Sequence, residues 1–201
     1  MTKKSGIKGI FRLFSAEAYK GTRAYIHTQK VYEILRTVLY FGVALSLFAA
    51  GIITTGNRLN LLTVVAVLGC LPASKSAVNM IMFLRCKGLG REAAARIAPC
   101  EGELTCLYDM AFTSYSKTFE VGHMAVKGNT VCGYSEKKDF PEKEFQAHLE
   151  PILKADNHKN VTVKIFTDLE KYKDRLMQLQ TLETEAGSTE GIVQTLKSVV
   201  L

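Results

Sequence analysis

Two long apolar segments dominate the hydrophobic pattern of the first half of the chain. Residues 37–55 (TVLYFGVALSLFAAGIITT) carry no charge, and residues 61–84 are apolar apart from a few polar positions that include Lys75. At about 1.5 Å per residue, either segment as a helix is long enough to cross a hydrocarbon layer of roughly 30 Å. The short connection between them predicts a helical transmembrane hairpin over residues 32–86. A hairpin buried inside a soluble protein is the alternative.

From residue 87 onward the pattern changes to short strand-like and helical segments. Strands are predicted over residues 104–114, 117–127, 130–135 and 160–168, with Gly128–Asn129 as a tight hairpin turn. Helices are predicted over residues 91–98, 142–154, 169–182 and 192–201. We expect Pro151 to interrupt or shorten the second helix, Asp168 to cap the third, and Gly187–Ser188 to end the third. The order α-β-β-β-α-β-α-α predicts a small α+β domain over residues 87–201, with helices on at least one face of its sheet.

The net charge of +7, from 26 Lys and Arg against 19 Asp and Glu, is unevenly distributed. A basic excess of this size is typical of proteins that bind nucleic acid or an anionic surface. Residues 1–100 carry 14 basic and 3 acidic side chains, whereas residues 101–201 carry 12 basic and 16 acidic side chains. Because the second half is acidic, we do not expect it to bind nucleic acid.

Basic residues flank the predicted hairpin on its outer side. Those expected at the membrane interface are Lys8, Arg12, Arg85, Lys87, Arg91 and Arg96. The loop between the apolar segments offers only Arg58, so the positive-inside rule places both termini in the cytoplasm of a two-pass protein of the cell membrane. The basic segment 1–31 has apolar positions on one helical side, which favours a helix lying on anionic lipid headgroups. A solvated basic tail is the alternative.

Lys75 and Asn79 are polar positions within the second apolar segment. A lysine at the centre of a membrane helix costs roughly 2.5–3.5 kcal/mol on insertion scales. Three interpretations stay open for Lys75: its side chain extends to the cytoplasmic interface, faces a protein partner or a second copy of the chain, or binds an anionic ligand.

The order of strands resembles that of restriction-endonuclease-like nucleases. Their metal site uses an acid on the second strand and Glu-x-Lys on the third; here Glu120 lies in the second predicted strand and Glu136-Lys137-Lys138 follow the third. Pairing about Gly128–Asn129 puts Glu120 opposite Lys137, so the resemblance implies a Mg²⁺ site at Glu120 and Glu136, with Lys138 beside it. No Pro-Asp precedes the Glu-x-Lys, and the domain is acidic where a DNA-binding surface is basic.

No other catalytic motif is evident, and neither the histidines nor the cysteines have the spacing of zinc ligands, so no metal and no cofactor other than this Mg²⁺ is predicted. Two segments, KTFEVGHMAVKGNTVCGYSE and NVTVKIFTDLEKY, resemble the soluble part of uncharacterised two-pass membrane proteins of Gram-positive bacteria. That resemblance implies a location and no activity. We therefore expect a membrane-tethered cytoplasmic module that binds a protein partner or copies of itself. A membrane-anchored, metal-dependent hydrolase is the alternative.

Overall fold

The computed structural model describes residues 19–57, 60–115, 117–158, 160–182 and 187–201. The chain divides into two compact units. The helical unit contains His27–Cys86, and the sheet unit contains residues 19–26 together with residues 87–201. Lys8 and Arg12, which were predicted at the membrane interface, lie outside the described residues.

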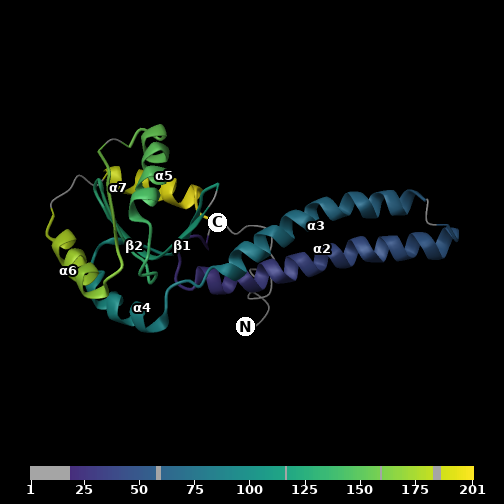
Figure 1. Cartoon of the computed structure of the whole chain (residues 1–201), viewed down its shortest axis with the longest axis horizontal. Helices are drawn as coiled ribbons and strands as arrows, with labels where there is room; N and C mark the ends of the chain where they lie inside the picture. Colours follow the sequence, from purple (N-terminus) through teal and green to yellow (C-terminus); the bar gives the residue numbers. More distant parts are fainter. Residues whose placement is uncertain (1–18, 58–59, 116, 159, 183–186) are drawn as a thin grey trace, which may run out of the picture. The chain divides into compact units, whose positions relative to one another are not determined.

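The helical unit is a hairpin of two long antiparallel helices that lie side by side (Figure 1). Helix α2 spans Tyr25–Thr55, and its first two residues belong to the sheet unit; helix α3 spans Leu61–Arg85. The Asn60 side chain caps α3 by accepting a hydrogen bond from Thr63 N at 2.8 Å. Pro72 lies inside α3 without ending it. Both helices are long and apolar enough to cross a membrane.

Small and polar side chains form the contact between α2 and α3. Ala44, Ala66 and Ala73 are buried, and a Cβ atom built at Gly69 would lie 3.7 Å from the Cβ of Ala44. Large apolar side chains lie outside, and the exposed fraction is 65% for Leu45. The two helices therefore pack closely through small residues and expose most of their bulky apolar ones; Phe83 is a buried exception.

The sheet unit follows the predicted order of elements. Its helices are α4 (Arg91–Ile97), η2 (Ala98–Cys100, a 3₁₀ turn), α5 (Glu142–Ala155), α6 (Leu169–Gln180) and α7 (Gly187–Ser198). Its strands are β1 (Thr105–Thr113), β2 (Thr118–Lys127), β3 (Thr130–Tyr134) and β4 (Thr162–Phe166). The sheet order is β1-β2-β3-β4, with antiparallel pairs except for the parallel pair β3–β4. This confirms the α+β class and the predicted order of elements.

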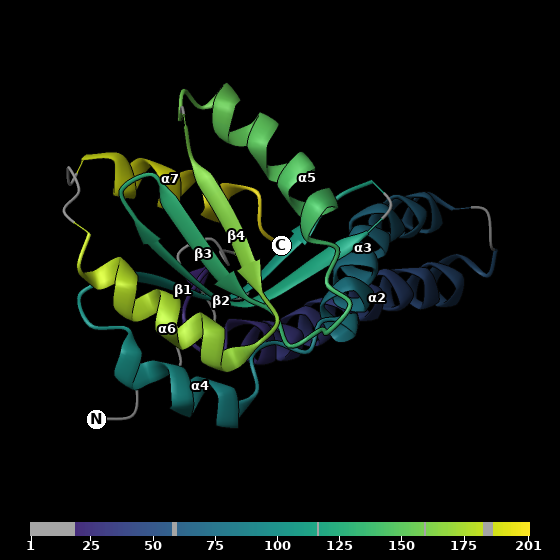
Figure 2. The same cartoon turned by 60° about the vertical axis from the view of Figure 1, so that its left-hand side comes forward.

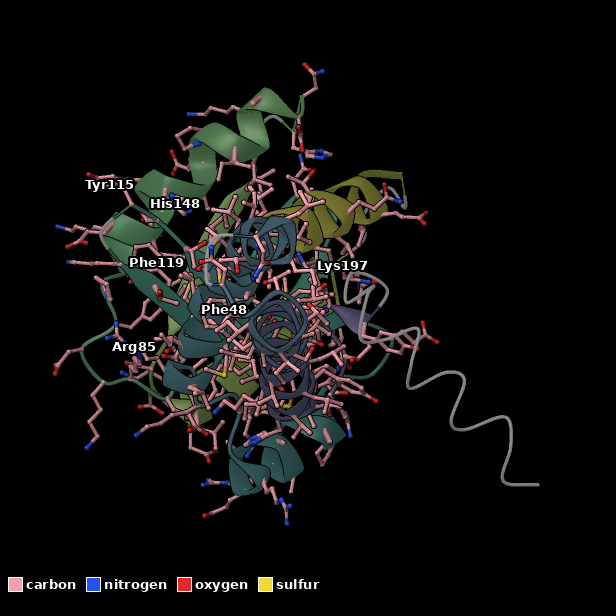
Figure 3. The ribbon with its side chains drawn as sticks, turned by 90° about the vertical axis from the view of Figure 1, so that its right-hand side faces the viewer. Phe48, Arg85, Tyr115, Phe119, His148 and Lys197 are labelled. Carbon is pink, nitrogen blue, oxygen red and sulfur yellow. The ribbon has the colours of Figure 1, made fainter. Side chains whose placement is uncertain are left out.

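Helices cover both faces of the sheet (Figure 2). On one face, α5 and α7 bury an apolar core in which the ring of Phe145 lies 5.2 Å from Phe112 and 5.5 Å from Phe119. The rings of Phe119 and His148, labelled in Figure 3, stack at 5.9 Å on this side. On the other face, α4 and α6 cover a smaller core around Tyr172.

The helices differ from the sequence prediction within α5, between α6 and α7, and at the end of α7, which stops at Ser198 instead of Leu201 because Val200 bridges to Phe112 in β1. Pro151 neither interrupts nor shortens α5, which continues to Ala155. The apolar side chains of α5 are fully buried at Phe145, Leu149 and Leu153. This packing outweighs the roughly 3 kcal/mol cost of a proline in a helix. Gly187 begins α7 instead of ending the helix before it, since α6 stops at Gln180. Asp168 caps α6 as predicted, with its carboxylate accepting from Glu170 N at 3.0 Å.

The segment 19–26 belongs with the sheet because it lies along the β1 edge. Gly21 O accepts a hydrogen bond from Tyr108 N at 3.0 Å, and the Tyr25 hydroxyl donates to Leu201 O at 3.0 Å. The chain end lies there too, since Leu201 N donates to Ala111 O at 3.1 Å. Together these contacts cover the backbone groups that β1 would otherwise expose at the edge of the sheet.

Candidate functional site

The alternation of buried side chains shifts by one residue in both β1 and β2. Leu107 and Met110 both face the core under α5 and α7, although a strand should bring residues two apart to one face. Val121 and Met124 repeat this three-residue step in β2. The shift centres on Asp109, whose φ of +53° is uncommon for a non-glycine residue and tolerated best by Asp or Asn.

Three carboxylates hold the segment 87–90 that leads into α4. Lys87 N donates to Glu120 Oε2 at 3.0 Å, Leu89 N to Asp109 Oδ1 at 2.7 Å, and Gly90 N to Glu136 Oε1 at 2.9 Å. Leu89 packs onto Gly122, where an added Cβ would lie 2.8 Å from its side chain. Glycine at 122 therefore leaves room for this segment at the point where the strands shift.

The residues of the nuclease hypothesis contribute to this anchor. Glu120 lies in β2 and pairs with Lys137 (2.7 Å), as the predicted register requires, while Glu136 and Lys138 are exposed beyond the end of β3. Their acidic groups accept hydrogen bonds from the backbone of the segment 87–90. Among the described residues, one group of three or more His, Cys, Asp or Glu side chains has its possible ligand atoms close together. Glu120 and Glu136 do not belong to it.

That group consists of Glu101, Cys106 and His123, whose ligand atoms all lie within 4.8 Å of one another. Glu101 precedes β1, Cys106 lies in β1, and His123 lies in β2. The strand register pairs His123 with Tyr108, so Cys106 is its diagonal neighbour two residues along β1. His123 is fully buried, whereas Cys106 and Glu101 are partly exposed.

Hydrogen bonds fix one side of the His123 ring. Its Nδ1 lies 2.6 Å from the hydroxyl of Tyr172, and that hydroxyl donates to Cys132 O at 3.5 Å. The other ring nitrogen, Nε2, lies 3.6 Å from Glu101 Oε1, and it is buried without a hydrogen-bond partner within the described residues. The ring is therefore anchored through Nδ1 and directs Nε2 towards Glu101.

Arg23 closes the cluster on its exposed side. Its Nη2 donates to both Glu101 oxygens, at 3.2 and 3.0 Å, and to the Tyr108 hydroxyl at 2.9 Å. The Arg23 side chain is 60% exposed, so it lies between the cluster and solvent.

Burial sets the protonation of the cluster at neutral pH. It raises the pKa of Cys106 to about 12, and the nearby Glu101 charge adds to this. It lowers the pKa of His123 to about 4, against the opposing effect of Glu101. Cys106 is thus a thiol and His123 is neutral, so the pair does not form the thiolate that a cysteine nucleophile requires.

A second polar cluster joins the end of α5 to α7. The Thr195 hydroxyl donates to Asp156 Oδ2 at 2.8 Å and lies 3.2 Å from His158 Nε2. These residues border a shallow depression that also includes Gly191 and Ser198. Because the hydroxyl bonds directly to the acid and histidine does not lie between them, this is a structural link and differs from a nucleophile–base–acid triad.

In the helical unit, Lys75 is exposed and Asn79 is half-buried on α3. Within the described residues Lys75 forms no ion pair with an acidic side chain. The four described basic residues of the predicted interface, Arg85, Lys87, Arg91 and Arg96, are all exposed, and Arg96 pairs with Glu170.

Comparisons with protein-family models, with curated proteins and with solved structures found no match to this chain. The support for the candidate site therefore comes from the geometry of this chain alone.

Sequence spacing did not indicate the Glu101–Cys106–His123 cluster. The 16 positions between Cys106 and His123 match no common zinc-ligand spacing, and only the β1–β2 register brings the two side chains together. The antiparallel register was the one signal that could have found them. That register is the same on both sides of Asp109, so it depends only on the position of the turn between β1 and β2.

Proposed function

We propose that this chain is a two-pass protein of the cell membrane that holds its sheet unit in the cytoplasm as a binding module. The module binds a protein partner or a second copy of the chain. The function is proposed as non-enzymatic, because the acidic groups that a nuclease-like site would use are engaged with the segment 87–90.

The observation that carries the membrane part is the distribution of side chains in the helical unit. Val38, Val67 and Leu71 are 62%, 62% and 69% exposed, while the polar residues Thr37 and Ser76 are 6% and 3% exposed. In water this arrangement would leave a large apolar surface hydrated, at about 25 cal/mol per Å². In a bilayer the same surface contacts lipid, and polar groups are favoured inside.

The pairing of the two helices supports an interfacial position for Lys75. Thr37 Oγ1 lies 2.9 Å from Ser76 Oγ, and Ala44 lies opposite Gly69, so positions at the same depth have numbers that sum to about 113. Lys75 is then level with Val38, about 3 Å deeper than Arg36. Residues 37–55 of α2 form a belt of about 27 Å that carries no charge of its own; Arg36 lies just outside one end of this belt, and Lys75 of α3 is level with its first turn.

This depth favours the first interpretation of Lys75, in which its side chain reaches the headgroups. A lysine stem extends several ångströms along a helix, so a position 3 Å inside the level of Arg36 needs no partner within the bilayer. The basic residues Arg85, Lys87, Arg91 and Arg96 follow at the same end of α3, and by the positive-inside rule this end faces the cytoplasm, with anionic headgroups as their partners.

Cysteine accessibility in intact cells tests the topology. With a membrane-impermeant maleimide, we expect Asn57→Cys to be labelled from outside and Glu150→Cys only after permeabilisation, with the unmodified chain as the background control. Labelling of Glu150→Cys in intact cells, or release of the chain from membranes by alkaline carbonate, would overturn the proposed location.

Cross-linking of the full chain in native membranes tests the binding part. We expect one discrete adduct, whose mass distinguishes a second copy from a different protein. If the chain is recovered only as a monomer at cross-linker concentrations that capture a known membrane dimer, the binding part of the proposal is wrong.

A further inference from the structure

We propose that Glu101, Cys106 and His123 form a zinc site. His123 Nε2, the Cys106 sulfur and Glu101 Oε1 would be the protein ligands, and water would take the fourth position. This site lies within the sheet unit and does not depend on the location of the protein.

The buried nitrogen of His123 is the observation that points to a ligand. Nε2 lies in a side chain that is fully buried, and it has no hydrogen-bond partner within the described residues. Its distance of 3.6 Å to Glu101 Oε1 is too long for a hydrogen bond. A buried polar atom left in this state costs free energy, and a metal ion between the two groups removes that cost.

The hydrogen bonds of the ring suit a zinc ligand. With zinc on Nε2, His123 Nδ1 carries the ring proton and donates it to the Tyr172 hydroxyl at 2.6 Å, and that hydroxyl donates to Cys132 O. In that tautomer Nε2 carries a free lone pair. Histidines that bind zinc typically donate their other nitrogen to such a second partner, which fixes the ring.

The distances are compatible with tetrahedral coordination. Zinc bonds of about 2.0 Å to nitrogen or oxygen and about 2.3 Å to sulfur require ligand atoms about 3.3–3.6 Å apart. The 3.6 Å between His123 Nε2 and Glu101 Oε1 already meets this requirement. All three ligand atoms lie within 4.8 Å of one another, so a rotation of the Cys106 side chain brings its sulfur to the required distance from the other two.

The donor set selects the ion. A sulfur, an imidazole nitrogen and one carboxylate oxygen suit zinc, whereas magnesium and calcium prefer oxygen ligands alone. Binding releases the thiol proton of Cys106 to solvent, because the thiolate is the form that coordinates. Arg23 can retain Glu101 Oε2, at 3.0 Å, while Oε1 turns to the metal, and its exposed side chain leaves a route for the ion.

Zinc titration of the full chain in detergent, after removal of metal by chelation, tests the site. We expect one equivalent of Zn²⁺ to bind, with Cys106→Ser and Glu101→Gln each weakening binding by at least about 100-fold and Tyr172→Phe by about 10–100-fold. Cys100→Ser is the matched control: it removes another partly exposed thiol outside the cluster and should leave binding unchanged.

Replacement by Co²⁺ gives a second readout. We expect a thiolate-to-cobalt charge-transfer absorption that is lost in Cys106→Ser and kept in Cys100→Ser. Circular dichroism of the metal-free variants checks their folding. If Cys106→Ser does not fold, the weakened Zn²⁺ binding expected of Glu101→Gln tests the site. Failure of the unmodified chain to bind Zn²⁺, binding that Cys106→Ser leaves intact, or a cobalt complex without the thiolate band would each overturn the proposal.

Discussion

The helical unit and the sheet unit distribute polar and apolar side chains in opposite ways. In the sheet unit, Phe112 and Phe145 are fully buried, and large apolar side chains fill both faces of the sheet. In the hairpin, Leu45 and Leu71 are 65% and 69% exposed, while Ser76 is buried. The proposed location of the helical unit in a bilayer and of the sheet unit in water accounts for this difference.

Water and lipid favour these two arrangements for different reasons. In water, burial of apolar surface stabilises the fold, so the sheet unit needs large side chains inside. In lipid that driving force is absent between helices, and close packing of small residues with a few hydrogen bonds replaces it. The contrast predicts that equivalent substitutions have unequal effects in the two units.

Removal of one aromatic ring should have the largest effect, and only in the sheet unit. Phe112 is fully buried and packs edge-to-face on Phe145, so Phe112→Ala should destabilise the unit by about 4 kcal/mol. Phe48→Ala removes a ring from α2 that is 38% exposed and should cost less than about 1 kcal/mol. Urea unfolding of the full chain in detergent, followed by near-ultraviolet circular dichroism, measures both. Equal losses of unfolding free energy in the two variants would contradict the proposed difference between the two units.

A charge introduced at an exposed apolar position should have a large effect in the helical unit and little effect in the sheet unit. Leu68 is 58% exposed on α3, level with Leu45 in the middle of the belt, and Leu68→Asp should oppose membrane insertion by about 3 kcal/mol. Met177 on α6 is 49% exposed, and Met177→Asp should leave insertion unchanged. The fraction of each variant that resists carbonate extraction gives the result. An unaffected Leu68→Asp would indicate that α3 does not contact lipid.

The hydrophobic pattern predicted the elements because their periodicity is local. The apolar segments 37–55 and 61–84, the Gly128–Asn129 turn and the Asp168 cap all depend on residues close in sequence, and the structure has helices, a hairpin and a cap there. Pro151 was misjudged because a local rule was applied where packing of α5 on the sheet outweighs it.

The candidate site could not be predicted in the same way. Cys106 and His123 come together through the β1–β2 register, and Glu101 joins them from the loop before β1, where no strand pairing fixes its position. The shift near Asp109 exchanges the two faces of the strands beyond the cluster, so it does not decide whether Cys106 and His123 share a face. The pairing of Glu120 with Lys137 was predictable because it depends only on the Gly128–Asn129 turn between β2 and β3.

Asp109 is therefore the next position at which to test the sheet unit. Its carboxylate accepts from Leu89 N at 2.7 Å, and its φ of +53° disfavours alanine. Asp109→Ala should destabilise the unit by about 2 kcal/mol, since both the acceptor and the tolerated backbone conformation are lost. Asp109→Asn keeps both and should cost less than half as much in the same urea experiment. If the two variants are equally destabilised, the negative charge is the decisive property, and the conformation contributes little.

The smallest effect expected is that of the hydrogen bond inside the hairpin. The hydroxyl oxygens of Thr37 and Ser76 are buried and lie 2.9 Å apart. If the hairpin lies in a bilayer as proposed, Ser76→Ala should weaken the contact between α2 and α3 by about 0.6 kcal/mol, the typical value for a hydrogen bond between membrane helices. Ser46→Ala is the control, because the Ser46 hydroxyl donates to Val43 O within its own helix. A double-mutant cycle with Thr37→Val, measured as unfolding of the hairpin in mixed micelles, isolates the pair. A coupling energy of zero would mean that small-residue packing alone joins the helices. A coupling energy of several kcal/mol would exceed what is expected for a hydrogen bond between helices in lipid, and it would indicate a hairpin that folds in water.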